Sequence, residues 1–474
     1  MKILYVAAEV VPFAKTGGLA DVASSLPLKL AELGHDIRVV MPMHRQIIEK
    51  YKHEMDYVKA YYVDLNWRRQ HVGLFQLEKN GVIYYFLDNE YYFNRNYLYG
   101  EFDDGERYAY FNKAVVRLLK EIDFKADVVH SNDWHSGLVN LFLYEFAKGD
   151  TFYQTIKKVF TIHNLKYQGV FPPEVLGEVM GVSYEYFNDD SIKYYDNINF
   201  MKAGIVYSDR VNTVSKSYAE EIKYPYFGEG LDGILNKHAY KLSGIINGID
   251  NDHYNPETDP TIYKNYSLKT IEDKVENKLK LQADLSLPID ANIPMIGLVS
   301  RFSDMKGLDL IAHILETLLQ HEVQLVILGT GEARYEEMFK HFAWRYPKKL
   351  SANIFFSNEL ANKIYAASDF FLMPSNSEPC GLSQLISLRY GTLPIVREVG
   401  GLKDTIIPFN QYTHEGNGFS FSNYNAYELL ETVFMALDVY EHKPEAMKQL
   451  IQNAMLSDHS WDQSVQDYLK LYTE

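Results

Sequence analysis

The chain has 474 residues, of which 47% are hydrophobic and 23% charged, a balance typical of folded globular proteins and not of disordered, collagen-like or disulfide-scaffold chains. Lys and Arg number 47 against 63 Asp and Glu, a net charge of −16, which disfavours nucleic acid or an anionic membrane as a partner because the long-range field repels a polyanion. The length predicts two or three domains. Any anionic substrate therefore requires a local basic pocket.

Cysteine usage and hydropathy predict the compartment. The one cysteine, Cys380, cannot form an intramolecular disulfide or a cysteine-rich metal site, which favours the reducing cytoplasm. No run of residues approaches the roughly 20 apolar positions of a membrane-spanning helix. The N-terminal residues MKILYVAAEV lack the length and cleavage site of a signal peptide. We expect a cytoplasmic protein.

The first half of the chain alternates strand and helix patterns. A strand at residues 3–7, a glycine loop, a helix at 20–33 and a strand at 37–41 predict a βαβ unit. Further apolar runs end in polar or glycine turns and predict more strands, and Ser217 with Glu220 has the spacing of a capping box. These runs lie at residues 82–87, 128–129, 159–162 and 211–214. We expect one open parallel sheet here.

The second half starts the same rhythm again after a turn-rich, polar stretch at about 245–290, which is the best candidate for a crossing between domains. Strands are predicted at 295–299, 324–328 and 370–373, and helices at 307–319 and after Gly381. The fold class is therefore α/β, with two Rossmann-like domains facing an inter-domain cleft, because ligands of open α/β sheets bind beyond the carboxyl ends of the strands.

The first candidate motif follows the first strand. KTGGLADV places Lys15 before Gly17 and Gly18 at the mouth of a helix, where helix N–H groups and a close backbone approach suit a phosphate or a hydroxyl. The motif is neither GxGxxG nor a P-loop, which disfavours a nicotinamide oxidoreductase. On its own, such a glycine turn can also be purely structural.

The second and third motifs follow strands of the second half. Arg301 and Lys306 are two cations placed to clamp a diphosphate whose leaving oxygen gains charge. Glu378 is a carboxylate for sugar hydroxyls, next to a helix start suited to phosphate oxygens. The neighbouring Cys380 is an alternative nucleophile, but no histidine base can be assigned to it, and a small packed residue is the preferred interpretation.

The fourth candidate group lies at the ends of two first-half strands. Asn132, Asp133, Trp134 and His135 follow one strand, and His163 with Asn164 follows another. Acid, amide, imidazole and indole groups together suit sugar binding. Neither HExxH nor paired Cys/His spacing occurs, so we expect no metal.

These motifs stand in an order that resembles the bacterial glycogen synthase and plant starch synthase family, and the resemblance spans nearly the whole chain. Members of that family are retaining glycosyltransferases with two Rossmann-like domains in the GT-B arrangement. The matching segments are KTGGLADV, NDWHS, TIHN, FGEGLDGIL, NGID, SRFSDMKGLDL, LGTGE, SEPCGLSQL and YGTLPIVREVGGLKDT.

The resemblance implies transfer of glucose from ADP-glucose to the non-reducing end of an α-1,4-glucan such as glycogen, with retention of configuration and without a cofactor. It implies an acceptor and catalytic domain at 1–243, with 457–474 packing back on it, and a nucleotide-sugar domain at 244–456. A hinge is expected near 243–250. The oligomeric state is left open, a homo-oligomer included.

The resemblance also assigns roles to residues. The catalytic set is His163, Asp133, Glu378, Arg301 and Lys306. The donor-binding set is Lys15, Gly18, Asp21, Asn164, Asn247, Phe356, Cys380, Gly381, Leu382 and Ser383. Ile386 stands where many retaining GT-B enzymes have a second glutamate, which puts a paired-carboxylate contact to the ribose in doubt.

Two alternatives of function and one of mechanism remain. A related glycosyltransferase with UDP-glucose or another acceptor would keep the same motifs, and a catalytically idle glucan-binding protein would be expected to lose one of them. Retention without an obvious nucleophile favours front-face attack assisted by the leaving diphosphate. A double displacement through Asp21, Asp133 or Glu378 is the rival mechanism.

Overall fold

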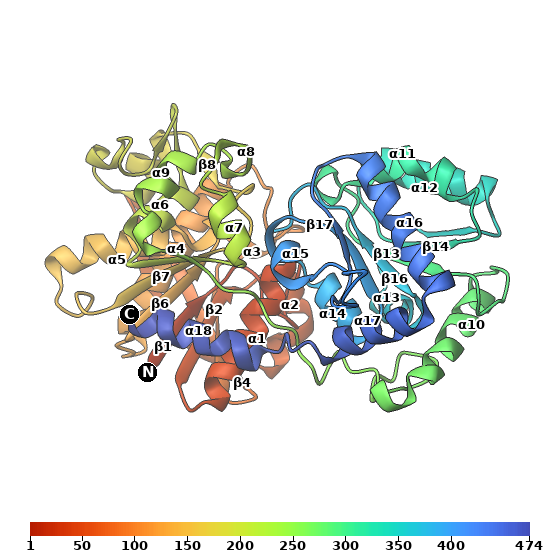
Figure 1. The fold of residues 1–474 in the computed structure, drawn as a ribbon. Coiled ribbons are helices and arrows are strands. Elements are labelled where there is room, and N and C mark those ends of the chain that lie inside the picture. The colour runs from red at the N-terminus through yellow and green to blue at the C-terminus, as the bar shows by residue number, and fades with distance from the viewer. The chain divides into compact units, whose positions relative to one another are not determined.

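The computed structural model describes all 474 residues, which form two compact units. Unit 1 comprises Met1–Gly248 and Trp461–Glu474, and unit 2 comprises Ile249–Ser460 (Figure 1). The division falls after residues 248 and 460 rather than after 243 and 456, because Ile245 packs in the core of unit 1 and the backbone N–H of Ile249 bonds to His459 O at 2.9 Å. No helix combines the length and apolar character needed to cross a bilayer.

Unit 1 is built on a nine-stranded sheet in the order β12-β11-β7-β6-β1-β2-β5-β4-β3. The strands from β12 to β5 are parallel. They are β1 (Lys2–Val6), β2 (Asp36–Pro42), β5 (Val82–Asp88), β6 (Val128–Asn132), β7 (Lys157–Ile162), β11 (Arg210–Thr213) and β12 (Leu242–Gly244). Because this part is covered on both faces, β1 is apolar along nearly its whole length, with Ile3 and Tyr5 packed in one core and Leu4 and Val6 in the other.

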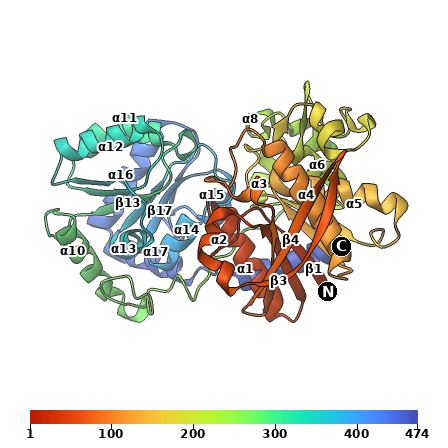
Figure 2. The same cartoon turned by 180° about the vertical axis from the view of Figure 1, so that it is seen from behind.

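The expectation of a purely parallel first-half sheet is wrong at one edge. A long hairpin of β3 (Asp56–Leu65) and β4 (Arg68–Lys79) adds two antiparallel strands next to β5 (Figure 2). The first half of β3 is mostly exposed and only its second half alternates buried with exposed residues, so the pattern that marks a strand is short. Tyr61 ties the hairpin to α4 (Asp104–Glu121) through a 2.8 Å bond from its hydroxyl to Ala114 O.

Helices cover both faces of this sheet (Figure 1). The helices are α1 (Gly18–Glu32), α2 (Arg45–Tyr51), α3 (Glu90–Phe93), α4, α5 (Leu138–Gly149), α6 (Phe200–Tyr207), α7 (Lys216–Glu221), α8 (Pro225–Gly228), α9 (Asp232–Lys237) and α18 (Trp461–Thr473). A small antiparallel sheet contains β8 (Val170–Phe171), β9 (Lys193–Tyr194) and β10 (Asn197–Asn199). The cap of α7 is Ser215, whose side chain accepts from the N–H of Tyr218, so the predicted capping box at Ser217 is wrong because the helix begins two residues earlier.

The last helix of the chain, α18, belongs to unit 1 and packs beside α1, so both termini lie in the same unit (Figure 1). Trp461, Tyr468 and Tyr472 are buried in the core that α18 shares with β1 and α1. The Tyr472 hydroxyl lies 2.7 Å from Nδ1 of the buried His130 on β6. The C-terminal segment therefore completes the core under β1.

Unit 2 has a six-stranded, entirely parallel sheet in the order β15-β14-β13-β16-β17-β18. Its strands are β13 (Met295–Val299), β14 (Gln324–Leu328), β15 (Leu350–Asn353), β16 (Phe370–Met373), β17 (Leu393–Arg397) and β18 (Phe419–Phe421). Its helices are α10 (Lys274–Asp284), α11 (Leu308–Leu318), α12 (Ala333–Arg345), α13 (Asn358–Ala367), α14 (Ser383–Arg389), α15 (Gly400–Thr405), α16 (Ala426–His442) and α17 (Pro444–Leu456). Both sheets confirm the predicted α/β class with two Rossmann-like units.

Candidate active site

In unit 1 the loops after three neighbouring parallel strands bring polar side chains to one edge of the sheet. Glu9 follows β1, Asp133 follows β6 and His163 follows β7, and these strands are adjacent in the order β7-β6-β1. Asp133 Oδ1 accepts from the backbone N–H of His163 at 2.7 Å and of Asn164 at 3.4 Å. The predicted group at residues 132–133 and 163–164 is thus one cluster, at the edge where ligands of such sheets bind.

The backbone at Asp133 is strained. Its φ of 54° with ψ of 179° lies in a region that is nearly restricted to glycine and costs about 1–3 kcal/mol. The bonds from Asp133 N to Thr161 O, at 2.9 Å, and from His163 N to the carboxylate hold it there. This strain aims a buried carboxylate at the strand edge, and burial raises its pKa to about 7.

Glu9 is a site residue that the sequence analysis did not select. It is buried, and its carboxylate accepts from the backbone N–H of Thr16 in the glycine loop. Burial raises the pKa of Glu9 to about 7, and the charge of Glu9 adds to the upward shift at Asp133. The available signal was a carboxylate between the central strand and the glycine loop.

The glycine loop itself carries an exposed ion pair. Lys15 Nζ lies 2.7 Å from Asp21 Oδ1 in the first turn of α1. The space beside Gly18 is open, since a Cβ placed there would meet no atom within 4 Å. A ligand can therefore approach the first N–H groups of α1, with the Lys15 ammonium next to them.

Further polar atoms of unit 1 lie at this end of the sheet without partners in the protein. Asn247, which follows β12, is buried and its Oδ1 has no hydrogen-bond partner. Both ring nitrogens of the buried His135 are likewise unpartnered, and burial holds the pKa of His135 well below its usual value. A ligand hydroxyl would satisfy atoms of this kind.

In unit 2 the central interaction joins the ends of two adjacent strands. Lys306, after β13, places its Nζ 2.6 Å from Oε2 of Glu378, after β16. Ser375 donates to the same oxygen at 3.0 Å. The Glu378 residue is only 7% exposed and the Lys306 side chain 27%, so the carboxylate is held rigidly while the ammonium still reaches the surface.

Arg301, also after β13, is exposed and forms no ion pair. Its loop is anchored on both sides by backbone bonds, from Phe302 N to Thr330 O at 2.8 Å and from Glu332 N to Phe302 O at 2.9 Å. The guanidinium therefore projects from a fixed loop, next in sequence to the Lys306 turn. Two cations at one strand end suit a diphosphate.

Two glycines permit the close packing that positions Glu378. A Cβ on Gly307 would lie 2.0 Å from Pro374 O, and φ at Gly307 is +68°. A Cβ on Gly401 would lie 2.0 Å from Cys380 O. The loop after β16 is thus pressed between the Lys306 turn and the start of α15, and a larger residue at either glycine would displace it.

The remaining predicted residues of unit 2 lie around this loop or at the far strand. Cys380 is buried, and Gly381, Leu382 and Ser383 form the half-buried entry into α14. Ile386 is buried on α14 and offers no polar group. Phe356 lies beyond β15, three strands from β16, and is 80% exposed, as expected of a ring that a planar base can stack on.

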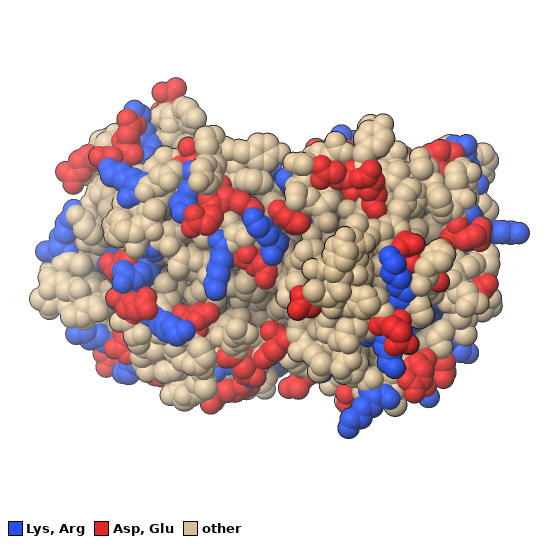
Figure 3. All heavy atoms as spheres, viewed as in Figure 1, with Lys and Arg blue, Asp and Glu red and all other residues tan.

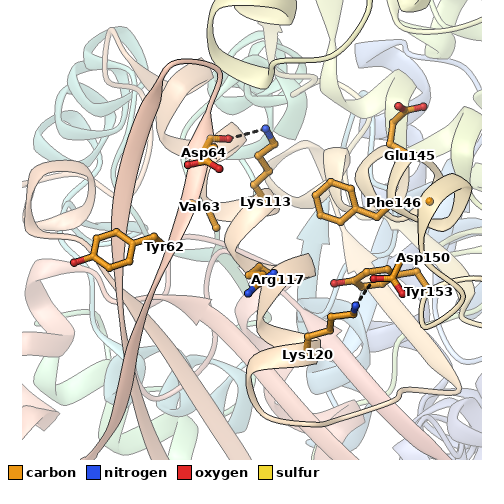
Figure 4. A pocket seen from close by; sticks show the side chains of 11 residues that line it. Tyr62, Val63, Asp64, Lys113, Arg117, Lys120, Glu145, Phe146, Asp150 and Tyr153 are labelled. Carbon is orange, nitrogen blue, oxygen red and sulfur yellow. Dashed lines mark hydrogen bonds and ion pairs between the residues drawn. The ribbon is translucent and has the colours of Figure 1, made fainter.

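A cavity of unit 1 contains none of these residues. It measures about 530 Å³ and is lined from β3, α4, α5 and the segment after α5 (Figure 4). Lys120 pairs with Asp150 there, and Lys113 donates to Asp64 O at 2.7 Å. These cations lie outside the two strand-end clusters.

The distribution of charged side chains bears on where an anionic substrate or a metal ion could bind. On the face in Figure 3, acidic and basic side chains are interspersed, so a substrate's charge must be met within a site. No group of three or more His, Cys, Asp and Glu side chains is arranged to hold a metal ion. The cations among the predicted site residues are Lys15 in unit 1 and Arg301 and Lys306 in unit 2.

Known proteins resemble this chain along its whole length. Residues 2–237 match the family model described as starch synthase catalytic domain, and residues 283–456 match glycosyl transferases group 1. Glycogen synthase from Finegoldia magna is 53% identical, covering 100% of this chain and 99% of that protein. Glycogen synthase from Streptococcus agalactiae is 51% identical, covering 100% of both.

Solved structures show the same likeness. The catalytic domain of starch synthase IV from Arabidopsis thaliana, bound to ADP and acarbose, has a TM-score of 0.92 at 30% identity, covering 100% of this chain and 98% of that one. Sucrose-phosphate synthase from Thermosynechococcus elongatus has a TM-score of 0.63 at 17% identity, a likeness of fold alone.

The fold, the two strand-end clusters and these matches define a glycosyltransferase of the GT-B fold. The chain belongs to the bacterial glycogen synthase and plant starch synthase family and is a glucosyltransferase. The resemblance stated from the sequence motifs is confirmed.

Proposed function

We propose that the protein transfers glucose from ADP-glucose to the non-reducing end of an α-1,4-glucan, with retention of the anomeric configuration. The observation that carries this proposal is the Lys306–Glu378 pair at the carboxyl ends of β13 and β16, with Arg301 exposed on the loop between β13 and Lys306. ADP in the starch synthase IV structure supports the adenine nucleotide. The glycogen synthase relatives support the glucan acceptor.

Residues of unit 2 bind the nucleotide-sugar donor. Arg301 and Lys306 neutralise the diphosphate and stabilise the negative charge that ADP gains as the glycosidic bond breaks. Glu378 accepts hydrogen bonds from glucose hydroxyls, an orientation that its bonds to Lys306 and Ser375 support. The backbone of Cys380–Ser383 contacts the donor, and Phe356 stacks on the base.

The cluster of unit 1 binds the transferred sugar. Asp133 and His163 contact glucose, with Asn164 and Asn247 as polar neighbours, and Lys15, Gly18 and Asp21 lie near the diphosphate and sugar. The strained backbone of Asp133 and the unpartnered Oδ1 of Asn247 support these assignments. Strain of this kind persists where surrounding structure compensates for it and is concentrated at binding sites.

Retention proceeds by attack on the face that the leaving group departs from. The bond between the anomeric carbon and the β-phosphate oxygen breaks, and its electron pair stays with ADP. That phosphate oxygen takes the proton of the acceptor hydroxyl, and the acceptor oxygen bonds to the same face of the oxocarbenium-like centre. A covalent glycosyl adduct on Asp21, Asp133 or Glu378 would contradict this sequence of events.

The test is incorporation of labelled glucose into glycogen from ADP-glucose and, in parallel, from UDP-glucose. We expect label mainly from ADP-glucose. Preference for UDP-glucose would move the protein to the related-transferase alternative, and no incorporation from either donor would contradict the proposed reaction.

Arg301→Ala tests the diphosphate clamp without disturbing the fold, because the Arg301 side chain is exposed and has no ion-pair partner. We expect transfer to fall about 10²–10³-fold, the loss typical of removing one charge-stabilising donor, with an unchanged unfolding midpoint. Arg345→Ala is the matched control, since Arg345 is an exposed arginine of α12 paired with Glu316 at 2.7 Å. Equal activity losses in the two variants would contradict the role of Arg301.

A further inference from the structure

The ring of His163 contacts a buried side chain to which the proposed reaction assigns no role. Its Nε2 lies 2.9 Å from Oδ1 of Asn132, the last residue of β6. The Tyr5 hydroxyl of β1 donates to the same oxygen at 3.0 Å. Tyr5 and Asn132 are fully buried, so solvent does not replace these bonds.

The orientation of the Asn132 amide follows from its other contact. Nδ2 lies 3.0 Å from the carbonyl oxygen of Val6, and a carbonyl can only accept. The NH₂ group must therefore face Val6, which leaves Oδ1 facing Tyr5 and His163. Reversing the amide would set two oxygens against each other at this distance.

The protonation of His163 follows in turn. An amide oxygen accepts but does not donate, so Nε2 of His163 carries a hydrogen and donates it to Asn132. Burial lowers the pKa of His163 to about 3, so the ring is neutral near pH 7 and Nδ1 bears a lone pair. Nδ1 has no bond within the protein and is not among the buried unpartnered atoms, so it is open to a ligand.

We infer that Tyr5 and Asn132 are positioning residues that hold His163 as the neutral Nε2–H tautomer, so that Nδ1 accepts a hydrogen bond from a hydroxyl of the transferred sugar. This inference rests on the proposed function only for the identity of the ligand. It assigns His163 the role of an acceptor, neither a general acid nor a cation, although imidazole is the side chain most often used for proton transfer.

The groups facing this ring come from β1 and from β6 with the residue after it. Asn132 ends β6 and Asp133 follows it, and His130 of β6 adds a further imidazole whose pKa burial lowers to about 3. Tyr5 lies on β1, and burial raises the pKa of its phenol well above the usual value, so it stays a donor. The one carboxylate among them, Asp133, is directed to the backbone N–H of His163 and not to its ring.

The experiment is long-range ¹H–¹⁵N correlation NMR of the full chain labelled at histidine nitrogens, with the His163 signals identified by their loss in His163→Gln. At pH 7 we expect the Nε2–H tautomer, and we expect the Nδ1 resonance to shift when ADP-glucose is added without acceptor. An Nδ1–H tautomer or an imidazolium would overturn the inference. This readout needs no turnover, so it is distinguishable from failure of the proposed reaction.

Variants separate positioning from folding. Asn132→Leu removes the acceptor, and we expect loss of the single tautomer and at least a 10-fold fall in kcat/KM. Asn132→Asp keeps an acceptor but adds a charge that favours the imidazolium, so we expect activity to fall at a higher pH than in the parent as pH decreases. Tyr5→Phe keeps the tautomer and lowers kcat/KM about 3-fold, the equivalent of one neutral hydrogen bond.

The matched control is Asn140→Leu. Asn140 is an equally buried asparagine on α5, and its Nδ2 bonds to Ser131 Oγ at 2.8 Å and Ser208 Oγ at 3.0 Å. It should lower stability without changing the His163 tautomer or the pH profile. If Asn132→Leu leaves the tautomer and the pH profile as Asn140→Leu does, Asn132 has a structural role only and the inference fails.

Discussion

Replacing Lys306 by methionine tests whether its ammonium acts on the substrate or merely stabilises Glu378. Methionine has a similar length and no charge, so the substitution leaves the carboxylate of a 7% exposed residue with Ser375 as its remaining side-chain donor. Breaking a fully buried ion pair costs about 3–5 kcal/mol. Because the Lys306 side chain is 27% exposed, we expect a smaller loss of about 2–3 kcal/mol for unit 2.

This loss corresponds to a fall of about 4–12 °C in the unfolding midpoint for a unit of this size. Differential scanning calorimetry measures it, and initial rates of glucose transfer from ADP-glucose measure activity on the same preparations. We expect transfer to fall about 10²–10³-fold, since a cation is lost where the leaving diphosphate gains charge. The single variant therefore loses both stability and activity.

The double variant Lys306→Met with Glu378→Gln separates the two effects. Glutamine removes the unpaired charge and still accepts from Ser375, so stability should recover to within about 1 kcal/mol of the parent. Activity should stay low, because neither the cation nor the carboxylate is restored. Recovery of transfer in the double variant would refute the reasoning, since it would mean that Lys306 acts only by stabilising its loop.

Three further predictions concern stability. Because burial raises the pKa of Glu9 and Asp133 to about 7, the folded state retains protons that the unfolded chain releases near pH 4.5. The free energy of unfolding of unit 1 should therefore fall as pH rises from about 4.5 to about 7. In urea titrations, Glu9→Gln should remove about half of this dependence on pH. An unchanged dependence would exclude Glu9 as a contributor to it. Gly307→Ala should lower the free energy of unfolding by about 3 kcal/mol, and Gly34→Ala by about 1 kcal/mol. Both glycines have a positive φ, but only at Gly307 would a Cβ meet a backbone oxygen. Equal losses in denaturant unfolding would contradict the packing argument. Tyr472→Phe should lower the free energy of unfolding of unit 1 by about 1–2 kcal/mol, because it leaves Nδ1 of the buried His130 without its partner. A loss within error would show that the hydroxyl is dispensable.

The parts of the fold that the sequence predicts are those whose pattern is local. The strand β16 and the four residues of β14 after Gln324 are unbroken apolar runs because both faces of a parallel sheet are covered. The hairpin β3–β4 was missed because an edge strand with one exposed face keeps charged residues on that face and alternates over only part of its length.

Some residues of the candidate site can likewise be predicted from the sequence, and others cannot. Residues on the loops that follow strands, such as Lys306 and Glu378, could be selected because topology alone brings the carboxyl ends of parallel strands to one edge. Glu9 was not selected because a single carboxylate after an apolar run is also what ends a strand. The roles of Tyr5 and Asn132 depend on which atom of an amide faces which neighbour, and only three-dimensional contacts reveal that.

The position of α18 has a consequence for the order of events during synthesis. Domains generally begin folding as they leave the ribosome, N-terminal first, yet the core under β1 lacks Trp461, Tyr468 and Tyr472 until α18 emerges. Unit 2, contiguous from Ile249 to Ser460, can finish folding while unit 1 still waits for its final helix. A nascent chain interrupted shortly before α18 would therefore hold a complete unit 2 and an unfinished unit 1, and its incomplete core would be exposed to proteases.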